Sequence, residues 1–128
     1  MGVSSPEDAL FDELCSVPLA VQWTMNPMGE ITYVSASVEQ LRGITPEQAK
    51  TQQVHEIHPP DSMRASLAYF EQFSIDVLAG RQPQAFHDRL DYYCADGTTV
   101  SCEVVAIPIL DEDGRVLELR GVSAPVMG

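Results

Sequence analysis

The second half of the chain contains three extended segments separated by two Asp-Gly pairs, and this pattern restricts the fold more than any other feature. The segments cover residues 84–94, 99–110 and 115–122, with Asp96-Gly97 and Asp113-Gly114 between them. Asp-Gly is favoured in two-residue hairpin loops, in which both central residues have positive φ. We therefore predict three consecutive antiparallel strands joined by two tight turns.

A similar turn signal occurs near the N-terminus. Asn26-Pro27-Met28-Gly29 separates two largely apolar segments at residues 19–25 and 31–35. Two such segments around a turn sequence predict a β-hairpin. A first hairpin is therefore expected to open the domain.

The region between the two β regions is predicted to be helical. Ser37 and Thr45 are expected to cap two short helices, of which the first ends at Gly43. One long helix is predicted over residues 61–79, with Asp61 as its N-cap, because apolar residues follow helical spacing there. The order hairpin, helices, three-strand meander defines an α+β fold.

A further helix is expected before the first strand, with Ser5 as its N-cap. Its apolar stripe packs either on the domain or on a second copy of the chain. The stripe comprises Leu10, Phe11 and Leu14. We assign residues 1–17 to this flanking helix and residues 18–128 to the domain itself.

Composition excludes several functions. The net charge of −12 argues against nucleic-acid binding, which needs clustered Lys and Arg, and against an anionic membrane surface. No apolar run approaches the roughly 18 residues of a membrane span, and the N-terminus does not resemble a signal peptide. A two-residue loop at Asp96-Gly97 would place Cys102 opposite Asp91 rather than Cys94, so no disulfide is expected. Reduced thiols predict a cytoplasmic protein.

These elements, in this order, resemble a PAS domain with its C-terminal PAC portion. The resemblance implies a five-stranded antiparallel sheet in the order 2-1-5-4-3. It also implies that short helices and one long helix cover one face of the sheet, with a pocket between them. The matching pieces are Trp23–Ser35, Leu41–Glu47, Ile57–Asp61, Asp96–Thr98, Asp113–Arg115 and Gly121–Ser123.

The resemblance also implies a sensory or dimerisation module. Such domains are usually attached to histidine kinases of two-component systems, diguanylate cyclases, phosphodiesterases or transcription regulators. We expect a signal-input domain that binds a small ligand and relays its state to an attached or partner output module. The alternative is a ligand-free homodimerisation module that uses the N-terminal apolar stripe.

The pocket is expected to be lined by residues of the sheet and the long helix. The candidates are Trp23, Tyr33, Met63, Arg64, Leu67, Phe70, Phe86, Leu90, Tyr92 and Val104. An anionic ligand would need a buried cation. The candidates for that cation are Arg42, Arg64, Arg81 and Arg89, and Arg64 is expected to lie nearest the pocket mouth.

No cofactor is required by the sequence. Covalent flavin photochemistry needs a cysteine that residues 35–61 lack, whereas a noncovalent flavin would stack on Trp23, which is otherwise a core residue. Haem needs an axial ligand, and the long helix has no histidine. His55 and His58 are spaced as a metal pair would be, but two prolines follow and no third ligand is evident, so no metal site is predicted.

Catalysis is not expected. The chain has no Gly-x-Ser-x-Gly elbow and no glycine-rich phosphate loop. An acid–base set like that of a cone-shaped α+β isomerase would need Asp88, Asp91, Tyr92 and Tyr93 on a curved sheet. The hairpin-then-helices order argues against that fold, so the prediction is a non-catalytic domain.

Overall fold

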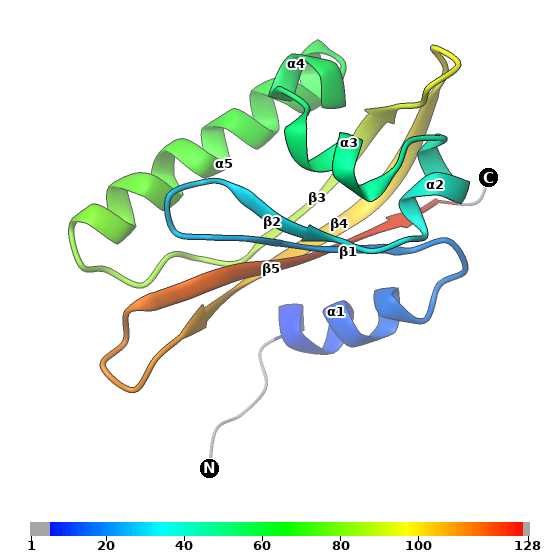
Figure 1. Cartoon of the computed structure of the whole chain (residues 1–128). Coiled ribbons are helices and arrows are strands. Elements are labelled where there is room, and N and C mark those ends of the chain that lie inside the picture. Colours follow the sequence, from blue (N-terminus) through cyan, green and yellow to red (C-terminus); the bar gives the residue numbers. More distant parts are fainter. Residues whose placement is uncertain (1–5, 127–128) are drawn as a thin grey trace.

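The computed structural model describes residues 6–126, which form one antiparallel sheet with helices on both faces (Figure 1). The strands are β1 (Val21–Met25), β2 (Ile31–Val34), β3 (Phe86–Tyr93), β4 (Thr99–Leu110) and β5 (Val116–Pro125). The helices are α1 (Pro6–Cys15), α2 (Val38–Arg42), α3 (Pro46–Thr51), α4 (Val54–Ile57) and α5 (Pro60–Leu78). The strand order β2-β1-β5-β4-β3 confirms the predicted topology.

All three hairpins have a three-residue loop, so the predicted two-residue Asp-Gly loops are wrong. In each, a backbone N–H before the loop donates to the carbonyl after it, at 2.8 or 2.9 Å. These pairs are Asn26–Glu30, Cys94–Thr98 and Asp111–Arg115. The third loop residue, Gly29, Gly97 or Gly114, has a φ of 91°, 87° or 80°, and the residue before it does not have positive φ. This combination is typical of a type I turn followed by a left-handed glycine.

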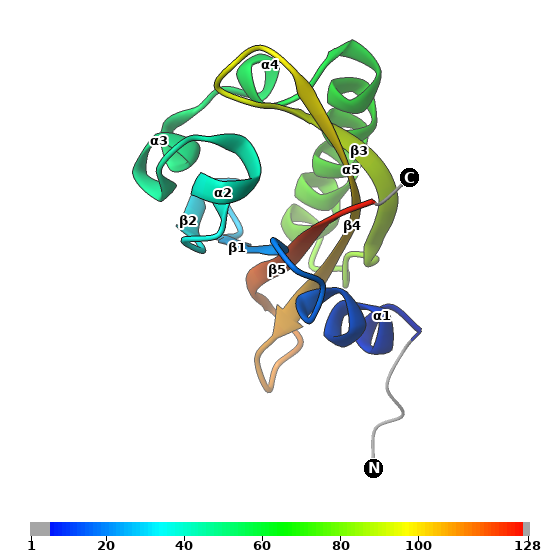
Figure 2. The same ribbon diagram turned by 90° about the vertical axis from the view of Figure 1, so that its right-hand side faces the viewer.

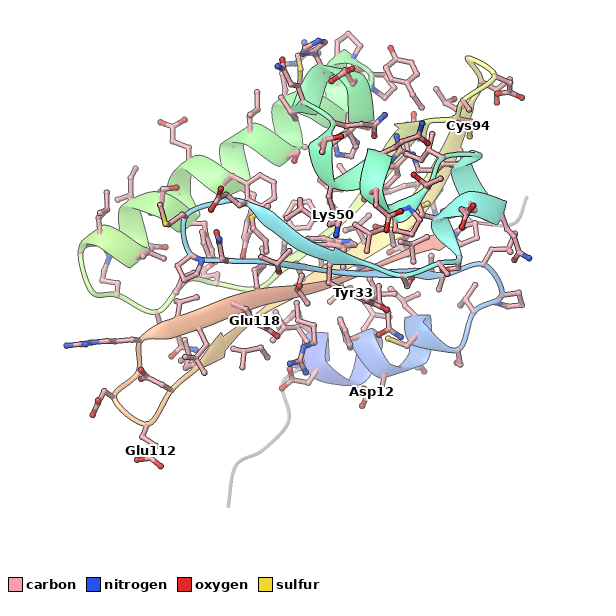
Figure 3. The ribbon with its side chains drawn as sticks, viewed as in Figure 1. Asp12, Tyr33, Lys50, Cys94, Glu112 and Glu118 are labelled. Atoms are coloured by element: carbon pink, nitrogen blue, oxygen red, sulfur yellow. The ribbon has the colours of Figure 1, made fainter. Side chains whose placement is uncertain are left out.

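The longer loop shifts the register of the β3–β4 hairpin by one residue. Cys102 therefore pairs with Leu90 rather than with Asp91. Cys94 lies where β3 meets the loop (Figure 3), away from Cys102 along the ladder. Both of these residues and Cys15 are free thiols.

The short helices are capped partly as predicted. Thr45 Oγ1 accepts a hydrogen bond from the Gln48 backbone N–H, and the Thr45 backbone N–H donates one to Gln48 Oε1. This capping box confirms Thr45 as the cap of α3. Gly43 ends α2 as expected. Ser37 does not cap α2, because its hydroxyl donates instead to the carbonyl of Ala20 at 2.7 Å.

The long helix begins one residue earlier than predicted. Pro60 is its first residue and Pro59 is its N-cap, so Asp61 lies inside the first turn and is not the cap. Proline favours the first helical position because its φ is already helical and its missing N–H has no partner to lose there. The predicted cap of α1, Ser5, lies outside the described residues.

The two faces of the sheet are covered by different helices (Figure 2). Helices α2 to α5 lie on the inner face, as expected, whereas α1 crosses the outer face. The apolar stripe of α1 packs on the domain's own sheet: Leu14 is buried against Val105, Val122 and Ala124, with Leu10 and Phe11 partly buried beside it. Of the two arrangements open to this helix, the structure shows packing on the domain.

Side chains from the helices close the free edge of β3. Nε of Arg42 donates to the Tyr93 carbonyl at 2.8 Å. The Asp91 N–H donates to the hydroxyl of Ser62, and Nδ1 of His58 lies 2.8 Å from the Asp91 carbonyl. These bonds satisfy backbone groups that an edge strand leaves unpaired. They also fix Arg42 and His58 between the helices and the sheet.

Candidate ligand pocket

A cavity of about 290 Å³ is lined by residues of the inner face of the sheet and of the segment that contains helices α2 to α5. Its walls are mainly apolar side chains from all five strands and from the helices. The residues around it are Val21, Trp23, Met25, Gly29, Ile31, Val34, Val38, Leu41, Arg42, Ala49, Gln52, Val54, Ile57, His58, Ser66, Leu67, Tyr69, Phe70, Phe86, Leu90, Tyr92, Val104, Ala106 and Ser123. A largely apolar cavity with a few convergent polar groups is typical of small-molecule sites.

The floor of the cavity depends on a glycine under an indole ring. Trp23 on β1 pairs with Gly121 on β5, and a Cβ added at Gly121 would lie 2.2 Å from ring atoms of Trp23. Only a residue without a side chain lets the indole lie this close to the strand. The indole Nε1 then donates to the hydroxyl of Ser123 at 3.1 Å.

Five polar side chains, which we call the polar wall, are linked to one another along one part of the cavity. They are Arg42, Gln52, His58, Tyr92 and Ser123. The phenol of Tyr92 is 2.7 Å from the Ser123 hydroxyl, and its ring centroid is 4.6 Å from that of His58. The Arg42 guanidinium carbon is 5.5 Å from the same ring, and Arg42 Nη2 donates to Gln52 Oε1 at 2.9 Å.

Arg42 carries the only formal charge in this lining at neutral pH. The residue is 6% exposed. Burial lowers the pKa of its guanidinium, although an arginine side chain remains protonated in proteins. None of the ion pairs within residues 6–126 includes Arg42. The polar wall therefore contains a buried cation without a carboxylate partner.

His58 is held in one neutral form. Burial lowers the pKa of its imidazole, and the nearby Arg42 charge lowers it further, against a raising effect of the hydrogen bond to Asp91. Nδ1 faces a carbonyl oxygen, which only accepts, so the proton of the neutral ring is on Nδ1. The other ring nitrogen, Nε2, is then a hydrogen-bond acceptor.

The remaining titratable groups of the pocket are inert at neutral pH. Burial raises the pKa of the Tyr92 phenol well above its ordinary value and raises that of Tyr69 to about 12. Burial also raises the pKa of the Cys102 thiol, behind the pocket wall, to about 12. A buried thiol of this kind is a poor nucleophile. Within residues 6–126, no group of His, Cys, Asp and Glu is arranged to hold a metal ion.

The structure places seven of the ten predicted pocket residues around the cavity: Trp23, Leu67, Phe70, Phe86, Leu90, Tyr92 and Val104. Tyr33 does not line the cavity, because Val34 pairs with Trp23 and shares its face, which turns Tyr33 to the opposite side of β2. Tyr33 is 51% exposed on this edge strand (Figure 3).

Two predicted residues of α5, Met63 and Arg64, also lie outside the cavity lining. The inward face of the helix carries Ser62, Ser66 and Phe73, and Met63 lies beside that face rather than on it. The side chain of Arg64 is 68% exposed and pairs with Asp61. The buried cation is therefore Arg42, which the sequence offered only as one of four candidates.

Several polar residues of the pocket were not predicted. Gln52 and Ser66 carry no local signal, because their positions depend on how short helices fold over the sheet. His58 was expected to be structural, and its bond to the Asp91 carbonyl supports that role. Ser123 had one usable signal: it alternates with Leu119 and Gly121 on the same face of β5, where side chains become small or polar.

Comparison with known proteins supports the fold. A family model described as "PAS domain" matches residues 19–123. The chain therefore belongs to the PAS domain family. None of the curated proteins compared with it matches.

Three solved structures illustrate the likeness. The PAS domain of a Colwellia psychrerythraea protein has a TM-score of 0.64 at 18% identity, covering 93% of this chain and 98% of that one. The N-terminal domain of a Marinobacter aquaeolei diguanylate cyclase with a PAS/PAC sensor has a TM-score of 0.66 at 18% identity, covering 83% and 94%. The PAS domain of the fruit-fly ELK potassium channel has a TM-score of 0.65 at 15% identity, covering 98% and 100%.

PAS domains are generally non-catalytic sensory or interaction modules, and no catalytic domain is evident in the described part of this chain. None of its helices between residues 6 and 126 is long and apolar enough to cross a membrane.

Proposed function

We propose that this chain is a signal-input PAS domain that binds a small molecule in the cavity and relays its state to an attached or partner output module. The observation that carries the proposal is the cavity itself, which joins an apolar interior to the polar wall. A core whose only task was stability would fill this space, because protein interiors are close-packed and voids lower stability.

The size of the cavity favours a small ligand. Ligand pockets in proteins have volumes of about 300–1,000 Å³, and at 290 Å³ this cavity lies at the lower end of that range. We therefore propose a ligand smaller than a flavin or a haem, with Trp23 as part of its wall.

A hydrogen-bond chain provides a route from the pocket to the last strand. Trp23 donates to Ser123, and Ser123 bonds Tyr92. Ser123 lies two residues before the end of β5, which pairs with both β1 and β4. A ligand that prefers one arrangement of Tyr92 and Ser123 shifts the population of β5 conformations, and the output module responds to that shift. One similar structure is the N-terminal domain of a diguanylate cyclase with a PAS/PAC sensor, which supports such an enzyme as the output module. A sensor kinase is the other output that we propose, and we place the protein in the cytoplasm.

Homodimerisation is the second candidate. Leu10 and Phe11 are only partly buried by the sheet, so part of the α1 stripe remains for a second copy of the chain. Light scattering of the Phe11→Asp variant at micromolar concentration tests this role. A dimer that survives the substitution rules out α1 as the interface, and dissociation to a monomer supports it.

The direct test of ligand binding is an absorption spectrum of freshly purified protein followed by native mass spectrometry of the same sample. We expect an additional bound mass. If the ligand is lost in purification, small molecules that enter the cavity should change the fluorescence of Trp23, the single tryptophan of the chain. Val104→Phe, which fills the cavity, should abolish both signals. A bare protein mass together with no fluorescence response to any small apolar compound would refute the proposal.

A further inference from the structure

The chain has an acidic surface but a cationic pocket. Its formal charge is −12, with 19 Asp and Glu residues, yet none of them lines the cavity. Arg42 is the single charged group of the lining, since His58 is neutral when its pKa is lowered. The sign of the charge inside the pocket is therefore opposite to that of the molecule as a whole.

The protein satisfies the Arg42 guanidinium only in part. A guanidinium has five N–H donors, and two of them donate to the Tyr93 carbonyl and to Gln52 Oε1. Both acceptors are neutral. The other three donors have no acceptor in the bonds found within residues 6–126, and since no buried side-chain nitrogen or oxygen there lacks a partner, Nη1 is accessible from the cavity that the guanidinium lines. A buried charge normally has a partner of opposite sign, because removing an ion from water is unfavourable unless another charge compensates.

The bonds to Tyr93 and Gln52 hold Arg42 in place before any ligand arrives. Its Nε is committed to the edge of β3, so the side chain cannot swing out to solvent without breaking that bond. A positioned guanidinium presents paired N–H donors that match the two oxygens of a carboxylate. The Arg42 guanidinium is therefore positioned to bind an anion in a mainly apolar cavity.

We propose that the ligand of this pocket is a monocarboxylate of about eight carbons, and that Arg42 binds its carboxylate. This inference rests on the proposed ligand-binding function and names the class of the ligand. One cation balances one negative charge, so a dianionic phosphate would bring an uncompensated charge into the pocket. The apolar body lies along the remaining wall, against residues such as Trp23, Phe70 and Phe86.

The alternative for Arg42 is a purely structural role at the edge of β3. In that case the cavity accepts apolar compounds without regard to charge. The two roles differ in a measurable way, because only the binding role separates a carboxylate from its neutral isostere. That comparison uses the wild-type chain and does not depend on the stability of any Arg42 variant.

The first experiment titrates the wild-type chain with octanoate and with octanamide, using Trp23 fluorescence and calorimetry at pH 7. The two compounds have the same chain and nearly the same shape, and differ in charge. We expect octanoate to bind about tenfold more tightly, since hydrogen bonds between two charged groups are about twice as strong as neutral ones. Octyl phosphate serves as the dianionic probe and is expected to bind more weakly than octanoate.

The outcomes separate the two proposals. Equal affinity for octanoate and octanamide, or tighter binding of octyl phosphate, overturns the carboxylate inference and leaves the ligand-binding function standing. No response to octanoate overturns the carboxylate inference, and the ligand-binding function falls with it only if native mass spectrometry gives a bare mass and no small apolar compound changes the fluorescence of Trp23. Tighter binding of octanoate supports both.

Substitutions then assign the preference to Arg42. Arg42→Met should make the affinities for octanoate and octanamide equal, and Arg42→Lys should restore part of the preference by keeping the charge without the paired donors. Arg64→Met is the matched control, because Arg64 is exposed on α5 and pairs with Asp61 outside the pocket. A preference that persists in folded Arg42→Met would show that another group binds the carboxylate and overturn the assignment.

Discussion

At the centre of β4 and β5 the residues on both faces of the sheet are buried, but the two faces are built differently. On the outer face, Val105, Val122 and Ala124 pack against α1 without polar partners. On the inner face the same strands present Gly121 and Ser123, and a cavity lies above them. Because residues alternate along a strand, each face is fixed by every second residue of β4 and β5. The volume and polarity of these side chains, rather than their burial, distinguish the packed face from the binding face.

The largest effect that the comparison predicts is at Gly121. Gly121→Ala places a Cβ 2.2 Å from ring carbons of Trp23, so the indole or β5 must move. Overpacking of this kind lowers the free energy of unfolding by about 3 kcal/mol. Urea unfolding of the variant measures the loss. Trp23→Leu in the same chain should recover part of it, and a Gly121→Ala variant as stable as wild type would show that the indole does not rest on this strand.

The protein should lose stability when a polar side chain is removed from the inner face, and also when one is added to the outer face. Ser123→Ala removes the partner of Trp23 Nε1 and of the Tyr92 phenol, and Ala124→Ser puts a hydroxyl into the apolar outer face. Each change is expected to lower the free energy of unfolding by about 2 kcal/mol, the cost of an unpaired buried polar group. Urea unfolding measures both. If Ala124→Ser is neutral, the outer face is not as dry as its packing indicates.

A matched pair of valines compares the faces directly. Val105 on the outer face and Val104 on the inner face are adjacent in β4, and they are 0% and 2% exposed. Val105→Ala opens a void in a packed layer and should lower the free energy of unfolding by about 2 kcal/mol. Val104→Ala enlarges an existing cavity and should lower it by about 1 kcal/mol, because a side chain at a cavity has fewer neighbours to lose. Thermal unfolding of both variants tests the order, and equal losses would contradict a real void on the inner face.

Local sequence pattern predicts much of the apolar lining of the binding face, whereas it does not predict most of the polar wall. Alternation along β3 predicted that Leu90 and Tyr92 point inward, and glycines placed each hairpin correctly. The loop length was wrong because Asp-Gly also ends a type I turn with a left-handed glycine, and this shifted the β3–β4 register by one residue. A register shift of one residue leaves the strand order unchanged, but it changes which residues of β3 and β4 face each other.

Arg42 shows why the polar wall was harder to predict. Arg42 lies at the end of a short helix, just before Gly43, and this local sequence does not distinguish an exposed arginine from a buried one. Burial follows from the free edge of β3, about fifty residues away, where its Nε meets the Tyr93 carbonyl. Only the tertiary fold brings the Tyr93 carbonyl to α2, and no periodic pattern in the sequence predicts this contact. Arg64 was the more plausible candidate because its position at the start of a long helix was predictable.

The smallest predicted effect concerns the pH dependence that the polar wall adds. Burial and the Arg42 charge lower the pKa of His58 below its ordinary value of 6.5, so the unfolded chain binds more protons than the folded one as pH falls through 6.5. The free energy of unfolding should therefore decrease below pH 6.5 and level off below the folded pKa. His58→Asn keeps a donor for the Asp91 carbonyl and removes the titration, so its stability should be less sensitive to pH in this window.

The control for this prediction is His55→Asn, at an exposed position on α4. It should keep the wild-type slope of stability against pH, measured by urea unfolding between pH 7 and pH 5. Among the described residues the outer face contains no buried histidine, since His87 there is half-exposed beside Glu103. A carboxylate bound at Arg42 would offset the charge that disfavours the imidazolium and raise the pKa of His58. Saturating octanoate should therefore reduce the slope of stability against pH in wild type but not in His58→Asn. An unchanged slope in wild type would show that the bound carboxylate does not affect the pKa of His58.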